Sequence, residues 1–400
     1  MLTGISSPFS PILLTASLGG IFFIVPRINK KLLTSNLLIL FFSFLALYLV
    51  IASVSGVFNQ HLLHPKNSYY PIVRGYVSSF VIVYIFYLLG VYYSSINKFK
   101  YLISVVMILL ILSVGFTLFA DVIGLTDSYQ FNAKKIIGER KGGLFANPNE
   151  AGQQANYCLA TVLFGILVYK RKIILGLLIA PILYSSFITF SKAALIVSVL
   201  LLALFVFFGV SNFLKFKTGN RILVVSFLFV IFSTAIVVPS YFNNNILGNL
   251  TVGQKYRIMN TIGLASGKID ARTTSERTVI SEIGIKNILK HPIFGSGLGS
   301  FHRLKEYGLG VHNSFLMVAG EAGILPFAMF FLFSVLVVLK SFWIQDPTIK
   351  IFFLLVLTVM YLQVFMPTHD ALSDRTSNAF LGIIMGFLRV KSYNKIRFSN

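Results

Sequence analysis

The residues best suited to chemistry in this chain lie at predicted helix starts. In the segment 140–150, the basic pair Arg140 and Lys141 precedes a tight turn and a predicted helix with Asn149 as its candidate N-cap. The N-terminus of a helix carries a partial positive charge, so a flanking basic pair favours anion binding there. An ordinary capped helix with basic residues at the membrane interface has the same pattern, and both interpretations stay open.

Two further predicted helix starts have the same character. One is at Ser191 and Lys192, and the other is at His312 and Asn313. All three helices are predicted to enter the membrane from one side, so their positive ends would face the same side, near Arg277. Several fixed donors of this kind suit a pyrophosphate. Taken alone, Lys192 is almost as well explained as a structural lysine whose charged end reaches the membrane surface.

His312 is the candidate proton carrier, and Glu321 is a candidate binding residue in the same helix. An imidazole exchanges its proton near neutral pH, so His312 is a candidate general base for a hydroxyl group, although a lone histidine is more often structural. Glu321 is expected two to three turns into the helix that starts at His312. A buried carboxylate there needs a partner, and Arg277 or Lys192 is the expected one. A structural role for Glu321 is an open alternative.

A glycine-rich motif lies near the end of the long polar segment 240–311. The run Gly295-Ser296-Gly297-Leu298-Gly299 resembles a phosphate-binding loop, but without a flanking strand this pattern is weak, and a tight turn is the alternative. Before it, apolar residues recur at helical spacing through 275–289. They predict an amphipathic helix on the membrane surface, capped by Thr274 or Ser275.

The elements that must position these residues are membrane-spanning helices. The 400 residues are 56% hydrophobic and only 12% charged, with a mean hydropathy of +0.82, whereas soluble domains have about 25% charged residues. We predict an all-α polytopic integral membrane protein with about 11 (10–12) transmembrane helices, one long extracytoplasmic loop at 240–311 and a single membrane domain over 1–400. The apolar runs fall at 8–26, 32–57, 76–93, 101–123, 149–169, 173–190, 192–210, 222–240, 312–339, 349–366 and 377–389.

The distribution of Lys and Arg predicts the orientation. Short connections are basic and are assigned to the cytoplasm; their basic residues are Arg27, Lys30, Lys31, Lys98, Lys100, Lys170, Arg171, Lys172, Lys215, Lys217, Arg221, Lys340, Lys350, Arg389, Lys391, Lys395 and Arg397. These connections are too short for a nucleotide-sugar site, so we expect the chemistry on the extracytoplasmic face. The other 17 of the 34 basic residues lie there. They favour an anionic ligand, and this distribution argues against nucleic acid as a partner despite the net charge of +22.

The acidic residues do not suggest a metal. The 12 Asp and Glu residues form no D-x-D motif, and no His, Cys and Asp cluster has metal-ligand spacing. We therefore expect a mechanism without metal or cofactor that depends on basic groups.

The order of these motifs resembles the O-antigen ligase and O-antigen polymerase superfamily of bacterial membrane glycosyltransferases. The resemblance spans residues 140–330, and its most specific part is the glycine-rich motif followed by His312 and Asn313. The residues that carry it are Arg140, Gly143-x-Phe145-x-Asn147-Pro148-Asn149, Ser191-Lys192, Arg277, His291-Pro292-x-x-Gly295-x-Gly297-x-Gly299-x-Phe301, His312-Asn313-x-Phe315-Leu316 and Glu321-x-Gly323.

The resemblance implies a fold similar to the C-type glycosyltransferases and a metal-independent, inverting glycosyl transfer on the outer face of the bacterial plasma (inner) membrane. The donor would be an oligosaccharide on undecaprenyl pyrophosphate, and the acceptor a glycan or a lipid. Arg277 and Arg140 would hold the pyrophosphate and His312 would activate the acceptor hydroxyl. We expect Lys141, Asn149, Lys192, Asn313 and Glu321 to help bind pyrophosphate or glycan, and a chain-length regulator and a flippase as protein partners.

The sequence departs from the family pattern in two places. Family members commonly have Ser-Arg where this chain has Ser191 and Lys192, which keeps the charge but loses the bidentate fork. Pro326 occupies a position that is Gly, Thr or Tyr in many ligases, which favours a repeat-unit polymerase over an O-antigen ligase. A lipid flippase or transporter is the alternative from another class. Its usual signs, midplane charges and paired broken helices, are not evident in the sequence.

Overall fold

The computed structural model describes residues 24–65, 69–122, 145, 147–169, 172–211, 271–305, 308–367 and 371–399. The chain divides into two compact units, Met1–Val106 with Ala271–Asn400 (unit 1) and Met107–Asp270 (unit 2). Each unit is described by itself. The predicted span 222–240, most of the predicted span 8–26, and the part 240–270 of the long segment 240–311 lie outside the described residues.

The described elements are helical, which confirms the predicted all-α membrane class. Among the described residues, six helices are long and apolar enough to cross a membrane: α2 (Asn36–Phe58), α3 (Tyr69–Ser95), α4 (Phe99–Val122) over its first 21 residues, α7 (Pro148–Val168), α16 (Ile324–Phe342), and α17 (Pro347–Val359) with the π-helical turn Met360–Phe365 that follows it. Each coincides with a predicted apolar run. The total of about 11 spans is not reached within the described residues.

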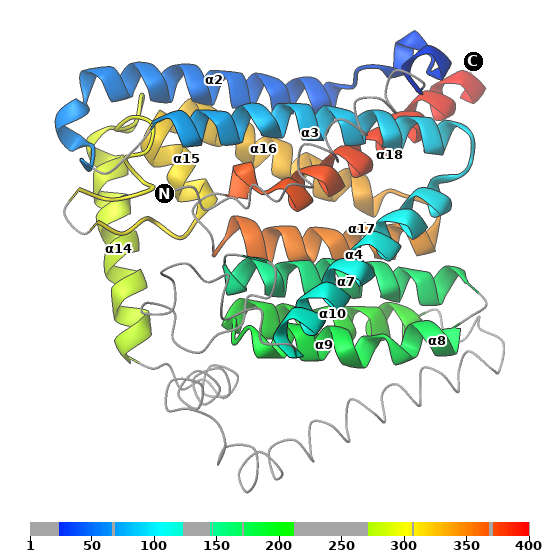
Figure 1. The fold of residues 1–400 in the computed structure, drawn as a ribbon. Coiled ribbons are helices and arrows are strands. Elements are labelled where there is room, and N and C mark those ends of the chain that lie inside the picture. The colour runs from blue at the N-terminus through cyan, green and yellow to red at the C-terminus, as the bar shows by residue number, and fades with distance from the viewer. Residues whose placement is uncertain are drawn as a thin grey trace, which may run out of the picture. The chain divides into compact units, whose positions relative to one another are not determined.

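Unit 1 is built around α2 and α3. Helix α16 packs against α2, and α18 (Arg375–Ser399) packs along α3 (Figure 1). The contact between α3 and α18 is close because glycines lie at the crossing: a Cβ at Gly386 would collide with the Tyr87 carbonyl, and Gly90 contacts the backbone of Ile383. Small residues allow this backbone approach between membrane helices, where packing replaces the hydrophobic effect as the main attraction.

One predicted helix is interrupted. The apolar run 312–339 forms two helices, α15 (Ser314–Ala322) and α16, separated by Gly323. Gly323 has a φ of +81°, a conformation that favours glycine, and a Cβ there would collide with the Ile293 carbonyl. Glu321 is therefore next to last in a short helix rather than in the middle of a long one.

The amphipathic segment is helical but starts earlier than predicted. Helix α14 covers Ala271–Lys290, so Thr274 and Ser275 lie inside it and are not its cap. Ile280 is buried, while Val279, Ile285 and Leu289 are exposed. Near the middle of the helix, Gly284 lies against Val311 and Phe301.

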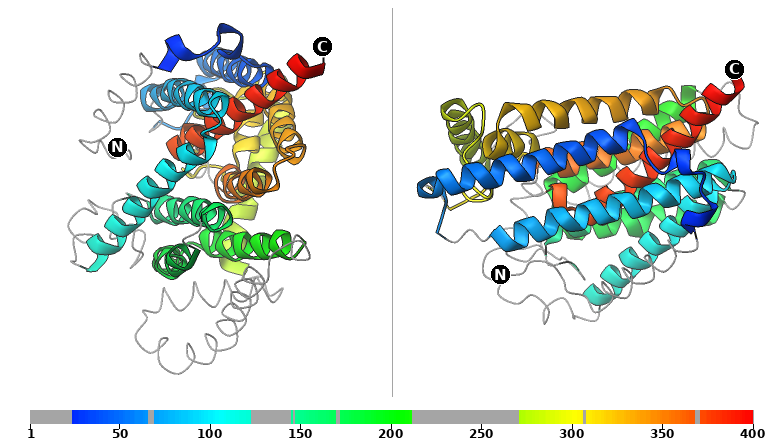
Figure 2. Two further views of the ribbon diagram at one scale, coloured as in Figure 1. Left: turned by 90° about the vertical axis from the view of Figure 1, so that its right-hand side faces the viewer. Right: turned by 90° about the horizontal axis from the view of Figure 1, so that it is seen from above.

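Unit 2 is centred on α7, whose residues from Ala151 to Gly165 are almost all buried. Helices α8 (Lys172–Leu177), α9 (Ile179–Ile188) and α10 (Lys192–Ser211) pack around it. The views from the side and above in Figure 2 show these helices. Asn156 links α7 to α10 by hydrogen bonds. Its side-chain amide donates to the Ala194 carbonyl at 2.9 Å, and its side-chain carbonyl accepts from the Ser198 hydroxyl at 2.6 Å. Polar side chains commonly link membrane helices in this way.

Candidate functional site

The glycine-rich loop, residues 291–311, is fastened to α2 and α15 by its backbone. The Leu298 N–H donates to the Ala52 carbonyl of α2 at 2.8 Å. The N–H groups of Ser296 and Gly297 donate to the carbonyls of Gly320 and Glu321 at 2.7 and 3.1 Å. Because these N–H groups are used by the protein itself, this part of the motif is a packing turn and not a phosphate cradle.

The glycines allow the loop to approach the helices closely. Gly297 has a φ of +103°, and a Cβ there would collide with Gly56 of α2. At Gly320 of α15, a Cβ would enter the ring of Phe301. The loop is therefore pressed between two helices, and its position follows from contacts that larger residues would prevent.

Glu321 is the buried centre of this arrangement. One carboxylate oxygen, Oε1, accepts from the Phe301 N–H at 3.0 Å and lies 3.0 Å from His302 Nδ1. The other, Oε2, accepts from the Tyr48 hydroxyl at 2.6 Å, and Tyr48 in turn lies 3.3 Å from the Tyr76 hydroxyl. Since an ionised carboxylate only accepts hydrogen bonds, His302 donates through Nδ1.

This network adds one residue to the candidate site. The described partners of Glu321 are Tyr48, Phe301 and His302. The expected pairing with Arg277 or Lys192 stays a prediction. Sequence reasoning assigned no role to His302. No spacing pattern indicated it, because it becomes a partner of Glu321 only when the loop folds back onto α15.

Hydrogen bonds fix the backbone on both sides of His312. The Val311 N–H donates to the Phe301 carbonyl at 3.0 Å. On the other side, Asn313 is the N-cap of α15, and its Oδ1 accepts from the N–H groups of Phe315 and Leu316 at 2.9 and 3.1 Å. The half-buried imidazole thus extends from a fixed backbone at the positive end of α15. That is a suitable arrangement for a general base.

Arg277 lies on α14, two turns before Gly284, which contacts Val311 beside His312. The structure describes the helical backbone of Arg277 but not its side chain. Arg140 and Lys141 lie outside the described residues. Their predicted roles in pyrophosphate binding stay predictions.

Unit 2 holds two of the predicted helix starts side by side. Gly152 in the first turns of α7 lies against the start of α10, where an added Cβ would be 2.7 Å from Ala194 Cβ and 3.7 Å from Ser191 Cβ. Because Asn156, one turn further along α7, bonds to Ser198, one turn further along α10, the two helices run parallel. Their positive ends therefore lie together, with the half-buried Lys192 at the first position of α10.

The cap of α7 differs from the predicted one. Asn147 is the N-cap and its side chain accepts from the Asn149 N–H at 2.9 Å. Pro148 takes the first helical position, where the absence of an N–H costs nothing, so Asn149 is moved to the second. Ser191 has the corresponding place at α10, where its Oγ accepts from the Ala194 N–H at 3.4 Å.

The candidate residues thus fall into two described sets. In unit 1, Phe301 of the glycine-rich loop links Glu321 to Val311, beside His312 and Asn313, and in unit 2 Asn149 and Lys192 lie at neighbouring helix starts. Within the described parts of the chain, no three His, Cys, Asp or Glu side chains are grouped so as to hold a metal ion.

Comparison with protein families gives one match. Residues 177–331 match the family model described as O-antigen ligase. The matched segment includes Lys192, Arg277, His312, Asn313 and Glu321, and leaves out Arg140, Lys141 and Asn149. No curated protein and no solved structure matches the chain. The chain is therefore similar, over less than half its length, to the O-antigen ligase and polymerase superfamily, which supports a multi-pass membrane glycosyltransferase of that general type.

Proposed function

We propose that this protein is a repeat-unit polymerase of the bacterial plasma membrane, which transfers a glycan from undecaprenyl pyrophosphate on the extracytoplasmic face. The observation that carries the proposal is the fixed, half-buried His312 at the start of α15, inside the segment that is similar to O-antigen ligases. In the proposed reaction, His312 accepts the proton of the acceptor hydroxyl. The acceptor oxygen attacks the anomeric carbon of the donor sugar from the face opposite the leaving group.

The leaving group is the lipid pyrophosphate, and it carries away the bonding electrons of the broken carbon–oxygen bond. We assign its charge to basic groups. Lys192, at the start of α10, and Arg277, on α14, are each assigned this role as the sequence predicts. Arg140 and Lys141 are assigned the same role from sequence alone. The transfer inverts the anomeric configuration and involves no metal or cofactor.

Glu321 has a different proposed role from the one expected first. Its two oxygens already accept three protein hydrogen bonds, so we assign it to positioning the loop that carries His312, through Phe301 and His302. A direct contact between Glu321 and the glycan remains the alternative.

An O-antigen ligase is the second candidate, and the description of the matching family favours it. Pro326, in the first turn of α16, is the residue that favours the polymerase. The two functions leave different products in cells that lack the protein. Loss of a polymerase leaves single repeats on the acceptor, whereas loss of a ligase leaves long chains on the lipid carrier.

The proposal is tested with His312→Ala and Arg277→Lys in cells that lack the native protein. We expect normal insertion, no polymer from His312→Ala and at most a trace from Arg277→Lys, read from chain-length ladders. The matched controls are His291→Ala, at the other end of the same loop, and Arg303→Lys, an exposed arginine within it. Normal ladders from His312→Ala, or equal loss in the controls, would reject the assignment.

A further inference from the structure

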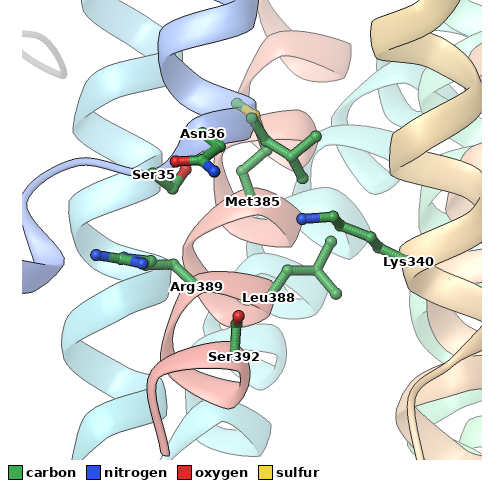
Figure 3. A pocket seen from close by; sticks show the side chains of 8 residues that line it. Ser35, Asn36, Lys340, Met385, Leu388, Arg389 and Ser392 are labelled. Carbon is green, nitrogen blue, oxygen red and sulfur yellow. The ribbon is translucent and has the colours of Figure 1, made fainter. Parts of the chain in front are cut away.

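A small cavity lies at the end of α2 that is remote from the glycine-rich loop. Its volume is about 50 Å³, and α2, α16 and α18 all contribute to its lining, which includes Ser35, Asn36, Lys340, Met385, Leu388 and Arg389. Figure 3 shows Lys340 reaching from α16 toward α2 and α18. A space of this size has room for roughly three to five water molecules. A phosphate group with its four oxygens is of comparable size.

The cavity is positively charged. Lys340 and Arg389 line it, and no carboxylate does. Arg389 donates through Nη2 to the Lys31 carbonyl at 2.6 Å, while its Nε is buried without a hydrogen-bond partner. Ser35 is the N-cap of α2, so the positive end of that helix faces the same space. Two cations, a helix N-terminus and an unsatisfied buried donor all favour an anion.

We infer that this cavity binds the phosphate group of an anionic phospholipid. An arginine fork and a lysine are suited to phosphate oxygens. Exposed apolar side chains lie within one helical turn of the lining residues Asn36 and Lys340 in the sequence: Ile39 at 53%, Leu339 at 43% and Trp343 at 77% exposure. They offer a surface for acyl chains, which a soluble phosphate lacks. Lys31, Lys340 and Arg389 all belong to segments predicted to be cytoplasmic, and anionic lipids are concentrated in that leaflet.

The test uses the full-length protein in a non-ionic detergent and measures its apparent melting temperature. Phosphatidylglycerol is compared with phosphatidylcholine and with inorganic phosphate at equal concentrations. We expect phosphatidylglycerol to raise the melting temperature and the other two to have little effect, because a ligand that binds the folded state stabilises it. Lys340→Gln removes most of this rise, and Arg389→Lys removes part of it, because the bidentate fork is lost.

The matched control is Lys391→Gln, which removes an exposed cation of α18 that does not line the cavity. It is expected to keep the full rise. An equal loss in Lys391→Gln would show that general surface charge is responsible and would overturn the inference. A full rise with inorganic phosphate would replace the lipid with a soluble anion. An equal rise with phosphatidylcholine in the wild-type protein overturns the inference without any variant. None of these outcomes bears on glycosyl transfer.

Discussion

The two ends of α2 use polar groups in opposite ways. At the loop end, Ala52 and Ser55 bond to the glycine-rich loop, and Tyr48 one turn earlier bonds to the buried Glu321. At the other end, which we call the cleft end, Ser35 caps the helix beside Lys340 and Arg389, and no carboxylate lines the cavity. At the loop end the buried carboxylate of Glu321 is paired within the protein, whereas the cleft end collects positive charge around an open space.

The two ends of α2 separate residues that the sequence assigns to opposite sides of the membrane. From Ser35 to Ser55 the helix rises about 30 Å, the thickness of the hydrocarbon core. Lys31, Lys340 and Arg389, all predicted to be cytoplasmic, gather at the cleft end. The loop predicted to be extracytoplasmic packs at the other end (Figure 1). Substitutions at the loop end should therefore affect folding and catalysis, and substitutions of cleft cations should affect ligand binding.

The largest effect on stability is expected from Glu321→Ala. It leaves the Tyr48 hydroxyl, the Phe301 N–H and His302 Nδ1 without their acceptor in a buried site. Leaving one buried donor without an acceptor costs about 1–3 kcal/mol, so the loss of the acceptor for three donors should cost at least about 3 kcal/mol. The measurement is denaturant unfolding in detergent micelles. Glu321→Gln keeps an acceptor oxygen and should lose less. If Glu321→Ala lowers the free energy of unfolding by less than about 0.5 kcal/mol, as is typical of surface sites, the loop end does not depend on the Glu321 network.

Gly297→Ala is expected to have the next largest effect. The new Cβ meets Gly56 of α2 at a φ of +103°, so strain and collision add, with an expected cost of about 2 kcal/mol or more. Gly308→Ala is the matched control: its φ is +65°, but the nearest atom to its Cβ, His64 Nε2, is 3.6 Å away. It should cost about 1 kcal/mol from backbone strain alone. Equal losses, measured by unfolding, would show that close contact with α2 is unimportant.

Hydropathy predicted the described spans because the apolar core of the bilayer requires long apolar runs. The runs for α2, α4 and α7 match the observed helices within a few residues at most ends. The break at Gly323 escaped prediction because it depends on contact with Ile293, thirty residues earlier in the chain, and not on local propensity. A glycine at one position in an apolar run does not reveal its φ.

The same reasoning explains what was found and missed at the site. Helix starts near Asn149, Lys192 and Asn313 were predicted from capping residues and proved close to the observed starts, since capping is local. His302 was missed because its pairing with Glu321 links residues 19 positions apart through a folded loop. The roles of His312 and Arg277 rest on the family resemblance. The experiments that test them therefore measure the glycan product of each variant.

The smallest expected effect comes from exchanging a helix cap, and it compares the two ends directly. Asn313 caps α15 at the loop end, and Asp346 caps α17 beyond α16, on the side of the cleft, with the same pair of side-chain bonds. Either residue changed to alanine should cost about 1 kcal/mol of unfolding free energy. Only Asn313→Ala should also lower glycan transfer, because the cap fixes the backbone beside His312. Asn313→Ser restores a capping oxygen, so it should recover both stability and transfer. Recovery of stability without transfer would instead show that the Asn313 amide contacts the substrate, as first predicted from the sequence.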